Sequence, residues 1–148
     1  MTQLTLAGPE HIEAVTRLVA DFHAEEGIAQ EDAARRAALM PLLEGSPLGA
    51  VYLAGVMRAP VGYVVVSFGW SIEFGGLIGV IDEFYIRPSV RGRGIGTEIL
   101  ATLPKALGRA GILSLHLDVA RDRQQVRRLY EKAGFVPREG DLMMVRRL

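Results

Sequence analysis

The stretch that decides the fold is "RPSVRGRGIGTEIL", residues 87–100, in which glycine occupies the alternate positions 92, 94 and 96. Glycine in a loop usually marks a backbone that needs a positive φ angle or a close approach to another group. Here the loop leads into a run typical of a helix, and the first turn of a helix presents N–H groups without intrahelical partners. The stretch therefore predicts an anion-binding turn, with a phosphate as the expected anion.

This loop differs from two common phosphate-binding signatures. A P-loop needs a glycine, four further residues and then Gly-Lys-Ser/Thr. The dinucleotide fingerprint has another glycine spacing and opens a Rossmann unit, whereas this loop follows an apparently antiparallel region. The alternative interpretation is a flexible strand-to-helix turn with solvated arginines, and the loop by itself does not decide between the two.

Composition limits the classes of function. A chain of 148 residues, 49% of them hydrophobic, suits one domain over residues 1–148. A formal net charge of zero argues against general binding to nucleic acid or anionic membranes. The absence of cysteine excludes disulfides and a thiol nucleophile, and the three histidines lack a metal-ligand spacing, so no metal is expected. The first residues lack the basic and apolar parts of a signal peptide, so we expect a cytoplasmic protein.

Apolar periodicity and turn residues predict the order of elements. The expected order is strand 3–7, helices 8–27 and 30–47, hairpin strands 49–57 and 61–74, strand 77–88, helix 97–111, strand 112–120, helix 122–135 and strand 140–148. Pro41 is expected to break the second helix, and Pro104 to kink or shorten the third. Asp122 is the expected cap of the last helix, and Gly27 is the expected end of the first. This order predicts an α+β protein with a mixed sheet.

Two motifs together resemble a known family. "VIDEFYIRPSVRGRGIG", residues 80–96, resembles the acetyl-CoA-binding motif of the GNAT superfamily of N-acetyltransferases, and "LYEKAGF", residues 129–135, resembles the family's second motif. One helix and one strand separate them, as the family requires. The resemblance implies a mixed, mostly antiparallel central sheet flanked by helices on both faces. It also implies direct transfer of an acetyl group from acetyl-CoA to a primary amine of a small molecule or protein.

The resemblance implies a set of residues that bind the cofactor. Backbone groups of Phe84 and Ile86 would pair with the pantetheine arm like an added strand, and the amide near Phe84 or Tyr85 would stabilise the carbonyl oxygen. The pyrophosphate would bind the loop formed by Arg91, Gly92, Arg93, Gly94, Ile95, Gly96 and Thr97. The chain departs from the family at Arg123, where members often carry a cofactor-contacting asparagine seven residues before the helix tyrosine.

Tyr130 is the predicted general acid for the leaving thiolate. A thiol has a pKa of about 8.5 and a tyrosine of about 10, so full proton transfer would be uphill by roughly 2 kcal/mol. The alternative is a core role, because Val126, Leu129, Tyr130 and Ala133 share one helical face.

The general base is predicted among adjacent carboxylates, Asp82 and Glu83. Neighbouring strand residues point to opposite faces, so only one should reach the site unless a bulge intervenes. Glu83 is slightly preferred for its longer side chain, while the looser resemblance to polyamine acetyltransferases favours Asp82. His116 is a third candidate. The alternative is a structural carboxylate that pairs with an arginine such as Arg87.

The acceptor site is harder to read from the sequence. Acidic residues at 25, 26, 31, 32 and 73 would attract a cationic amine, or form a solvated acidic surface. Trp70 and Phe74 would line an apolar cleft, or be ordinary hairpin aromatics. A competing class is a CoA-binding module without catalysis, and a nucleic-acid-binding domain using "RGRG" is a further alternative. The apolar run "LMMV" near the end of the chain suggests a homodimer.

Overall fold

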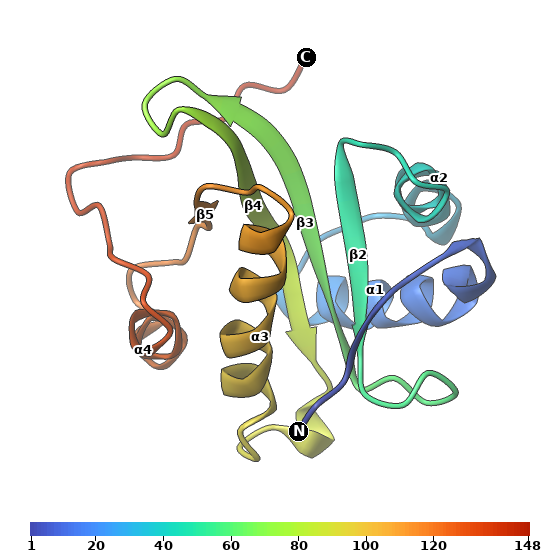
Figure 1. Cartoon of the computed structure of the whole chain (residues 1–148). Helices are drawn as coiled ribbons and strands as arrows, with labels where there is room; N and C mark the ends of the chain where they lie inside the picture. Colours follow the sequence, from blue (N-terminus) through green and yellow to red (C-terminus); the bar gives the residue numbers. More distant parts are fainter.

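The computed structural model describes all 148 residues as one sheet with helices on both sides (Figure 1). The strands are β1 (Leu4–Leu6), β2 (Gly49–Ala54), β3 (Gly62–Ser71), β4 (Gly76–Ile86) and β5 (Leu115–His116). The helices are α1 (Ile12–Glu26), α2 (Asp32–Leu43), α3 (Ile95–Arg109) and α4 (Gln124–Lys132), with short 3₁₀ turns η1 (Pro9–His11) and η2 (Pro88–Val90). The strand order is β1-β2-β3-β4-β5, and every pair is antiparallel except β4–β5.

Alternation along the strands gives the sheet two buried faces. Tyr63 and Val65 of β3 pack with α1 and α2, whereas Val64 and Val66 pack with α3. Side chains of α4 pack against the edge of the α3 cluster. The predicted class, a mixed and mostly antiparallel sheet with helices on both faces, is confirmed.

Some of the helix ends predicted from local residues are observed, and others are not. Gly27 ends α1 in the left-handed region at φ 71°, as predicted. The predicted break at Pro41 is wrong, because α2 continues to Leu43, and Pro104 does not shorten α3, which reaches Arg109. Burial of Leu103 and Leu107 on the sheet offsets the hydrogen bond that Pro104 removes. Asp122 is not a cap, because α4 begins after Arg123 without a side-chain cap.

A β-bulge in β4 places both adjacent carboxylates on the same side of the sheet. Val65 pairs with Glu83 and the next residue, Val66, pairs with Ile81, so Asp82 is the extra residue. Ile81 packs with α3 while Tyr85 packs with α1, which shows the change of face across the bulge. Only one of Asp82 and Glu83 was expected to reach the site unless a bulge intervened, and the structure has such a bulge.

Strands β4 and β5 separate after a short contact. Only Gly79–Leu115 and Val80–His116 are paired, so the strand predicted over 112–120 reduces to two residues. Beyond Val80, β4 has β3 on one side and no strand on the other. Figure 1 shows the chain after β5 turning away from the sheet toward α4.

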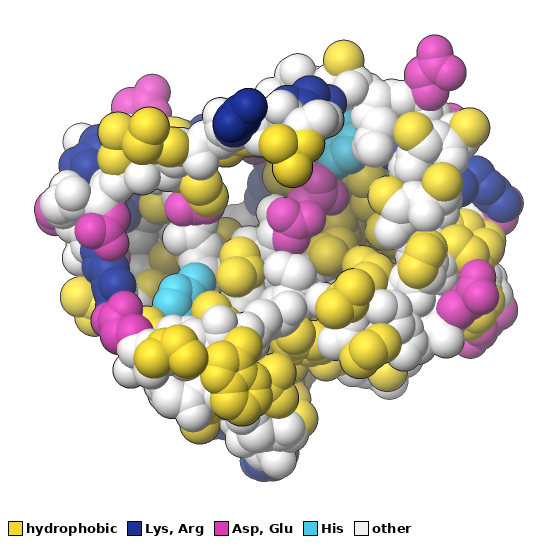
Figure 2. Space-filling view, turned by 90° about the horizontal axis from the view of Figure 1, so that it is seen from above, with side chains coloured by type: hydrophobic (Ala, Val, Ile, Leu, Met, Phe, Trp, Pro, Cys, Tyr) yellow, Lys and Arg dark blue, Asp and Glu magenta, His cyan; other side chains and the backbone are white.

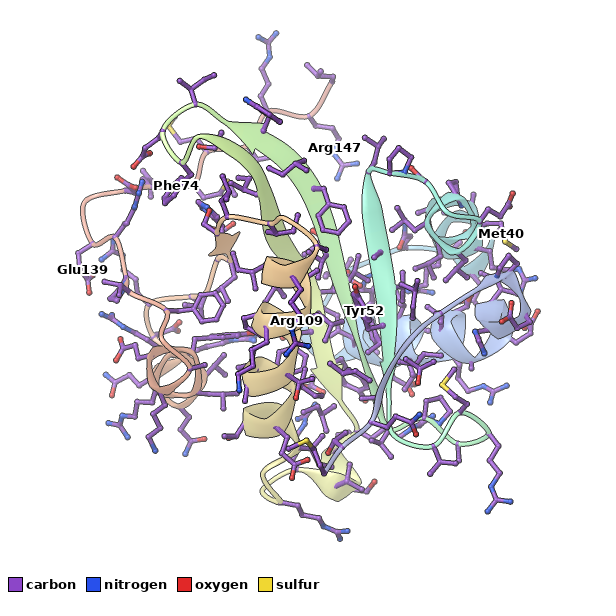
Figure 3. All side chains as sticks on the ribbon, viewed as in Figure 1. Met40, Tyr52, Phe74, Arg109, Glu139 and Arg147 are labelled. Carbon is purple, nitrogen blue, oxygen red and sulfur yellow. The ribbon has the colours of Figure 1, made fainter.

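The last predicted strand is also absent. Residues 140–148 form no strand and are exposed, because they do not lie along either edge of the sheet, β1 or β5. The preceding segment is tied to the β3–β4 turn instead. Arg138 forms an ion pair with Glu73 at 2.7 Å and lies 5.4 Å from the Phe74 ring, while Glu139 lies on the outer side (Figure 3). None of the helices combines the length and apolar character needed to cross a membrane.

Candidate active site

The gap between β4 and β5 opens into a cleft of about 670 Å³, here named the β4–β5 cleft. Its walls come from the end of α1, the second half of β4, the loop before α3, the segment after β5, and α4. Seen from above, the surface is hollowed between the sheet and the C-terminal segment, and acidic and histidine side chains border the hollow (Figure 2). All the predicted cofactor-binding residues line the cleft except Arg93, which is exposed elsewhere.

The glycine loop presents a row of free backbone donors at one end of this cleft. Gly92 and Gly94 have φ angles of 77° and 82°, which favour glycine strongly. Each amide from Gly92 to Thr97 lacks a hydrogen-bond acceptor within the chain, and α3 begins at Ile95 with the positive end of its dipole facing the same space. A Cβ on Gly96 would make ordinary van der Waals contacts, 3.4 Å from Ile86 and 3.5 Å from Leu129, so packing does not by itself require glycine there. These features are those of an anion-binding turn.

Arg91 is engaged with the end of α1 rather than held over the loop. Its guanidinium forms an ion pair with Glu25 at 2.7 Å, donates to the Ile86 carbonyl at 2.8 Å, and lies 5.5 Å from the centre of the Tyr85 ring. The charge that the sequence assigned to the loop is therefore partly neutralised by Glu25.

Arg123 forms a second link between the cleft and α1. Two of its nitrogens bond the two carboxylate oxygens of Glu26, at 2.6 and 2.7 Å. Hydrogen bonding to Arg123 lowers the pKa of Glu26, and Glu26 in turn raises the pKa of Arg123. The sequence flagged Arg123 as a departure without indicating this partner, because the two residues are 97 positions apart.

The two adjacent carboxylates have unlike surroundings. Glu83 is 18% exposed and accepts hydrogen bonds on both oxygens, from His23 Nε2 at 2.6 Å and from the Tyr63 hydroxyl at 2.8 Å. Asp82 has no hydrogen-bond partner in the chain. Desolvation by partial burial in the cleft, followed by repulsion from Glu83, raises its pKa.

His23 and Tyr63 are functional candidates that the sequence did not indicate. His23 continues the apolar stripe of α1, and Tyr63 sits in a run of β-branched residues, so both resemble core positions. Their polar ends meet at Glu83, a contact between three elements that only the fold brings together.

Tyr130 extends from α4 into the same cleft. Its ring lies 6.5 Å from the Phe84 ring and 5.7 Å from the Phe135 ring, measured between centroids. Burial alone raises the pKa of Tyr130 to about 12. The phenol therefore stays protonated over the working pH range and is available as a hydrogen-bond donor.

The remaining candidates lie elsewhere. His116 does not line the cleft; it bonds Ser114 at 2.8 Å and packs edge-on against Phe74 near the β3–β4 turn. Arg87 approaches Asp21 at 3.6 Å rather than the adjacent carboxylates. Trp70 is exposed and lies outside the cleft, as does Phe74.

A splayed parallel pair of strands, an anion-binding turn and a cleft with opposed acidic and phenolic groups define an acyl-CoA-dependent transferase fold. Comparison with known proteins supports this class. The profile of the acetyltransferase (GNAT) family matches residues 12–135. The chain therefore belongs to the GNAT acetyltransferase family.

Solved structures agree with this assignment. An integron cassette protein from the mobile metagenome of Cole Harbour Salt Marsh is 31% identical, with a TM-score of 0.85 over 99% of this chain and 90% of that one. A putative acetyltransferase from Arthrobacter sp. FB24 is 28% identical, with a TM-score of 0.79 over 99% and 94%. A predicted acetyltransferase from Clostridium acetobutylicum, solved with acetyl-CoA, shares the fold at 20% identity and a TM-score of 0.79, over 98% of this chain and 96% of that one. No curated protein sequence matches the chain significantly.

Proposed function

We propose that the protein is an N-acetyltransferase that transfers an acetyl group from acetyl-CoA directly to a primary amine of a small molecule or protein. The observation that carries the proposal is the row of six unpaired amides, Gly92 to Thr97, which lies in the same cleft as two carboxylates of β4. Acyl transfer to an amine needs an anchored cofactor, a proton acceptor for the amine and a donor for the leaving group.

The residues present fit acetyl-CoA. The pyrophosphate suits the unpaired amides and the α3 N-terminus, and the free side of β4 from Ile81 to Ile86 suits an extended amide-bearing arm. When bound, acetyl-CoA supplies the activated acetyl thioester. The amide of Phe84 or Tyr85 is our candidate donor to the carbonyl oxygen.

We assign the two carboxylates different roles. Asp82, unpartnered and with a raised pKa, is the proposed proton acceptor for the amine, directly or through water. Glu83, held by two donors, is the proposed fixed negative charge that orients the cationic acceptor. This reverses the slight preference for Glu83 that side-chain length alone suggested.

Tyr130 is the proposed hydrogen-bond donor to the departing sulfur. With its pKa at about 12, against about 8.5 for a thiol, complete proton transfer is uphill by roughly 5 kcal/mol. We therefore assign it stabilisation of the thiolate by a short hydrogen bond, with the proton taken up afterwards from solvent or from the amine.

Calorimetric titration with acetyl-CoA, with CoA and NADH as controls, tests the first half of the proposal. Binding of acetyl-CoA and CoA without NADH is expected. A thiol-release screen over polyamines, aminoglycosides, amino acids and peptide amines tests the second half. Binding without release for any amine class would support the competing interpretation, a non-catalytic CoA-binding module.

A further inference from the structure

His23 lies between a carboxylate and a guanidinium in the interior of the α1 side. Its side chain is 6% exposed. Nε2 lies 2.6 Å from Glu83 Oε2, and Nδ1 lies 3.2 Å from Nε of Arg35 on α2. Arg35 is itself 11% exposed and is held by Asp32 at 2.7 Å.

These contacts determine which ring nitrogen of His23 carries hydrogen. An arginine Nε always bears hydrogen and can only donate, so His23 Nδ1 must be the acceptor. A neutral imidazole then carries its single hydrogen on Nε2, where it is donated to Glu83. A second proton would have to go on Nδ1, directly against the N–H of Arg35 and beside its charge.

The other oxygen of Glu83 is held in the same way. The Tyr63 hydroxyl donates to Oε1 at 2.8 Å, and burial followed by the charge of Glu83 raises the pKa of Tyr63 far above its usual value. Tyr63 therefore stays a donor at every working pH. Both neighbours therefore donate to Glu83, which also lines the cleft.

The charged groups around His23 have opposite effects on the addition of a second proton to its ring. Glu83 and Asp82 of β4 favour a second proton, whereas Arg35 of α2 opposes it, and Tyr63 of β3 stays neutral. Removal of Arg35 would leave two carboxylates facing an imidazole whose Nδ1 is free to accept a second proton.

We propose that Arg35 locks His23 as the neutral Nε2–H tautomer, so that Glu83 offers an undiminished negative charge to a cationic amine between pH 6 and 8. His23 and Arg35 are then positioning residues that act through Glu83. The part that concerns the amine rests on the proposed function, whereas the tautomer lock stands on the contacts alone.

Nitrogen NMR of the histidine rings tests the lock without substrate. The wild type is expected to show His23 as the neutral Nε2–H form, unchanged between pH 6 and 8. In Arg35→Met the same signal should move toward the doubly protonated form as the pH falls. Arg36→Met is the matched control, because Arg36 lies on a more exposed side of α2 and pairs with Glu13 of α1. A wild-type His23 that is Nδ1–H or charged at pH 7 overturns the proposal.

Kinetics test the consequence for the amine, with spermidine or whichever amine the screen shows to be acetylated. The wild type and each variant are compared on the same amine at the same pH, so titration of the amine itself cancels and the difference in KM reports the charge in the cleft. Arg35→Met should raise the KM at pH 6 relative to pH 8 by roughly three- to fivefold, with kcat little changed, whereas Arg36→Met should not. Adding His23→Gln, whose amide donates at any pH, should remove the pH dependence. If the ratio of KM at pH 6 to KM at pH 8 is the same in Arg35→Met as in the wild type, the role in amine binding is overturned. If the screen finds no acetylated amine, the proposed function is overturned, and the NMR experiment still tests the tautomer of His23.

Discussion

Asp82 and Glu83 are neighbours whose environments separate their chemistry. Glu83 is buried among donors, so its charge is stabilised by His23 and Tyr63. Asp82 protrudes at the bulge without a donor, so partial burial and repulsion from Glu83 disfavour its charge. Two carboxylates in unlike surroundings are a common way to divide acid–base tasks within one site.

Asp82→Asn tests the role of the unpartnered carboxylate. We expect kcat at pH 7 to fall by about a hundredfold or more, because the proton acceptor is lost. The folded-state pKa of Asp82 is raised, so its charge costs stability above that pKa and this cost disappears as the pH falls toward the unfolded value of 3.8. The variant should therefore have a higher Tm than the wild type at pH 7 and an equal Tm near pH 4.

The control for this variant is Asp141→Asn in the exposed C-terminal segment. It should leave the activity unchanged and should not raise the Tm at pH 7. If Asp82→Asn is less stable than the wild type at neutral pH, the charge of Asp82 is stabilised in the fold, and its assignment as the base loses its physical support.

Tyr130→Phe tests the donor. Loss of a single positioned donor should lower kcat by about ten- to a hundredfold while the Kd for acetyl-CoA, measured by calorimetry, stays nearly constant. Since burial raises the pKa of Tyr130 to about 12, ionisation of this phenol should produce no loss of rate below about pH 11. Tyr52→Phe is the matched control, because Tyr52 is also partly buried but lies on β2 away from the cleft. An unaltered rate in Tyr130→Phe would mean that Tyr130 has only a packing role in the core.

At the scale of elements, local signals and the β2–β3 hairpin were predictable, whereas the pairing of segments distant in sequence was not. The glycine loop and the helix after it are encoded within a few residues, so the anion-binding turn was predicted from sequence, although the predicted helix began at residue 97 and the observed one begins at Ile95. The extent of β5 depends on where its partner β4 diverges, and the predicted C-terminal strand depended on pairing with a sheet edge that its segment does not reach. Likewise, the bulge at Asp82 appears only in the register of β3 against β4. The contacts of His23 and Arg123 span 60 and 97 residues, beyond any local pattern.

Gly94→Glu tests the loop as the phosphate site. Gly94 has a φ of 82° and open space around its Cα, so glutamate would strain the backbone and place a negative charge beside the unpaired amides. We expect calorimetry to show the affinity for acetyl-CoA reduced by about a hundredfold or more. Gly140→Glu, the same change in open space on the exposed C-terminal segment, should leave it unaltered. Equal affinities for the two variants would assign the phosphates to another part of the cleft.

At the scale of the whole molecule, ion pairs join distant segments around the cleft. Glu25 and Glu26 at the end of α1 hold Arg91 before α3 and Arg123 before α4. At the other end of the molecule, Glu73 holds Arg138 and thereby keeps the C-terminal segment beside the β3–β4 turn (Figure 1). Exposed pairs of this kind contribute little stability each, so their main effect is to fix where the segments lie.

That arrangement gathers exposed apolar side chains at one end of the molecule. Trp70 and Ile72 of the turn region are 70% and 88% exposed, and the segment Leu142–Val145 is exposed throughout. Contiguous apolar surface of this kind commonly marks a protein interface. We therefore expect a homodimer in light scattering at micromolar concentration. Met144→Lys should shift it to a monomer by placing a charge in the apolar contact, while Arg147→Lys, a charge-conserving change in the same segment, should not. A wild-type monomer at that concentration would contradict the homodimer and leave the cleft, which a single chain completes, as the functional unit.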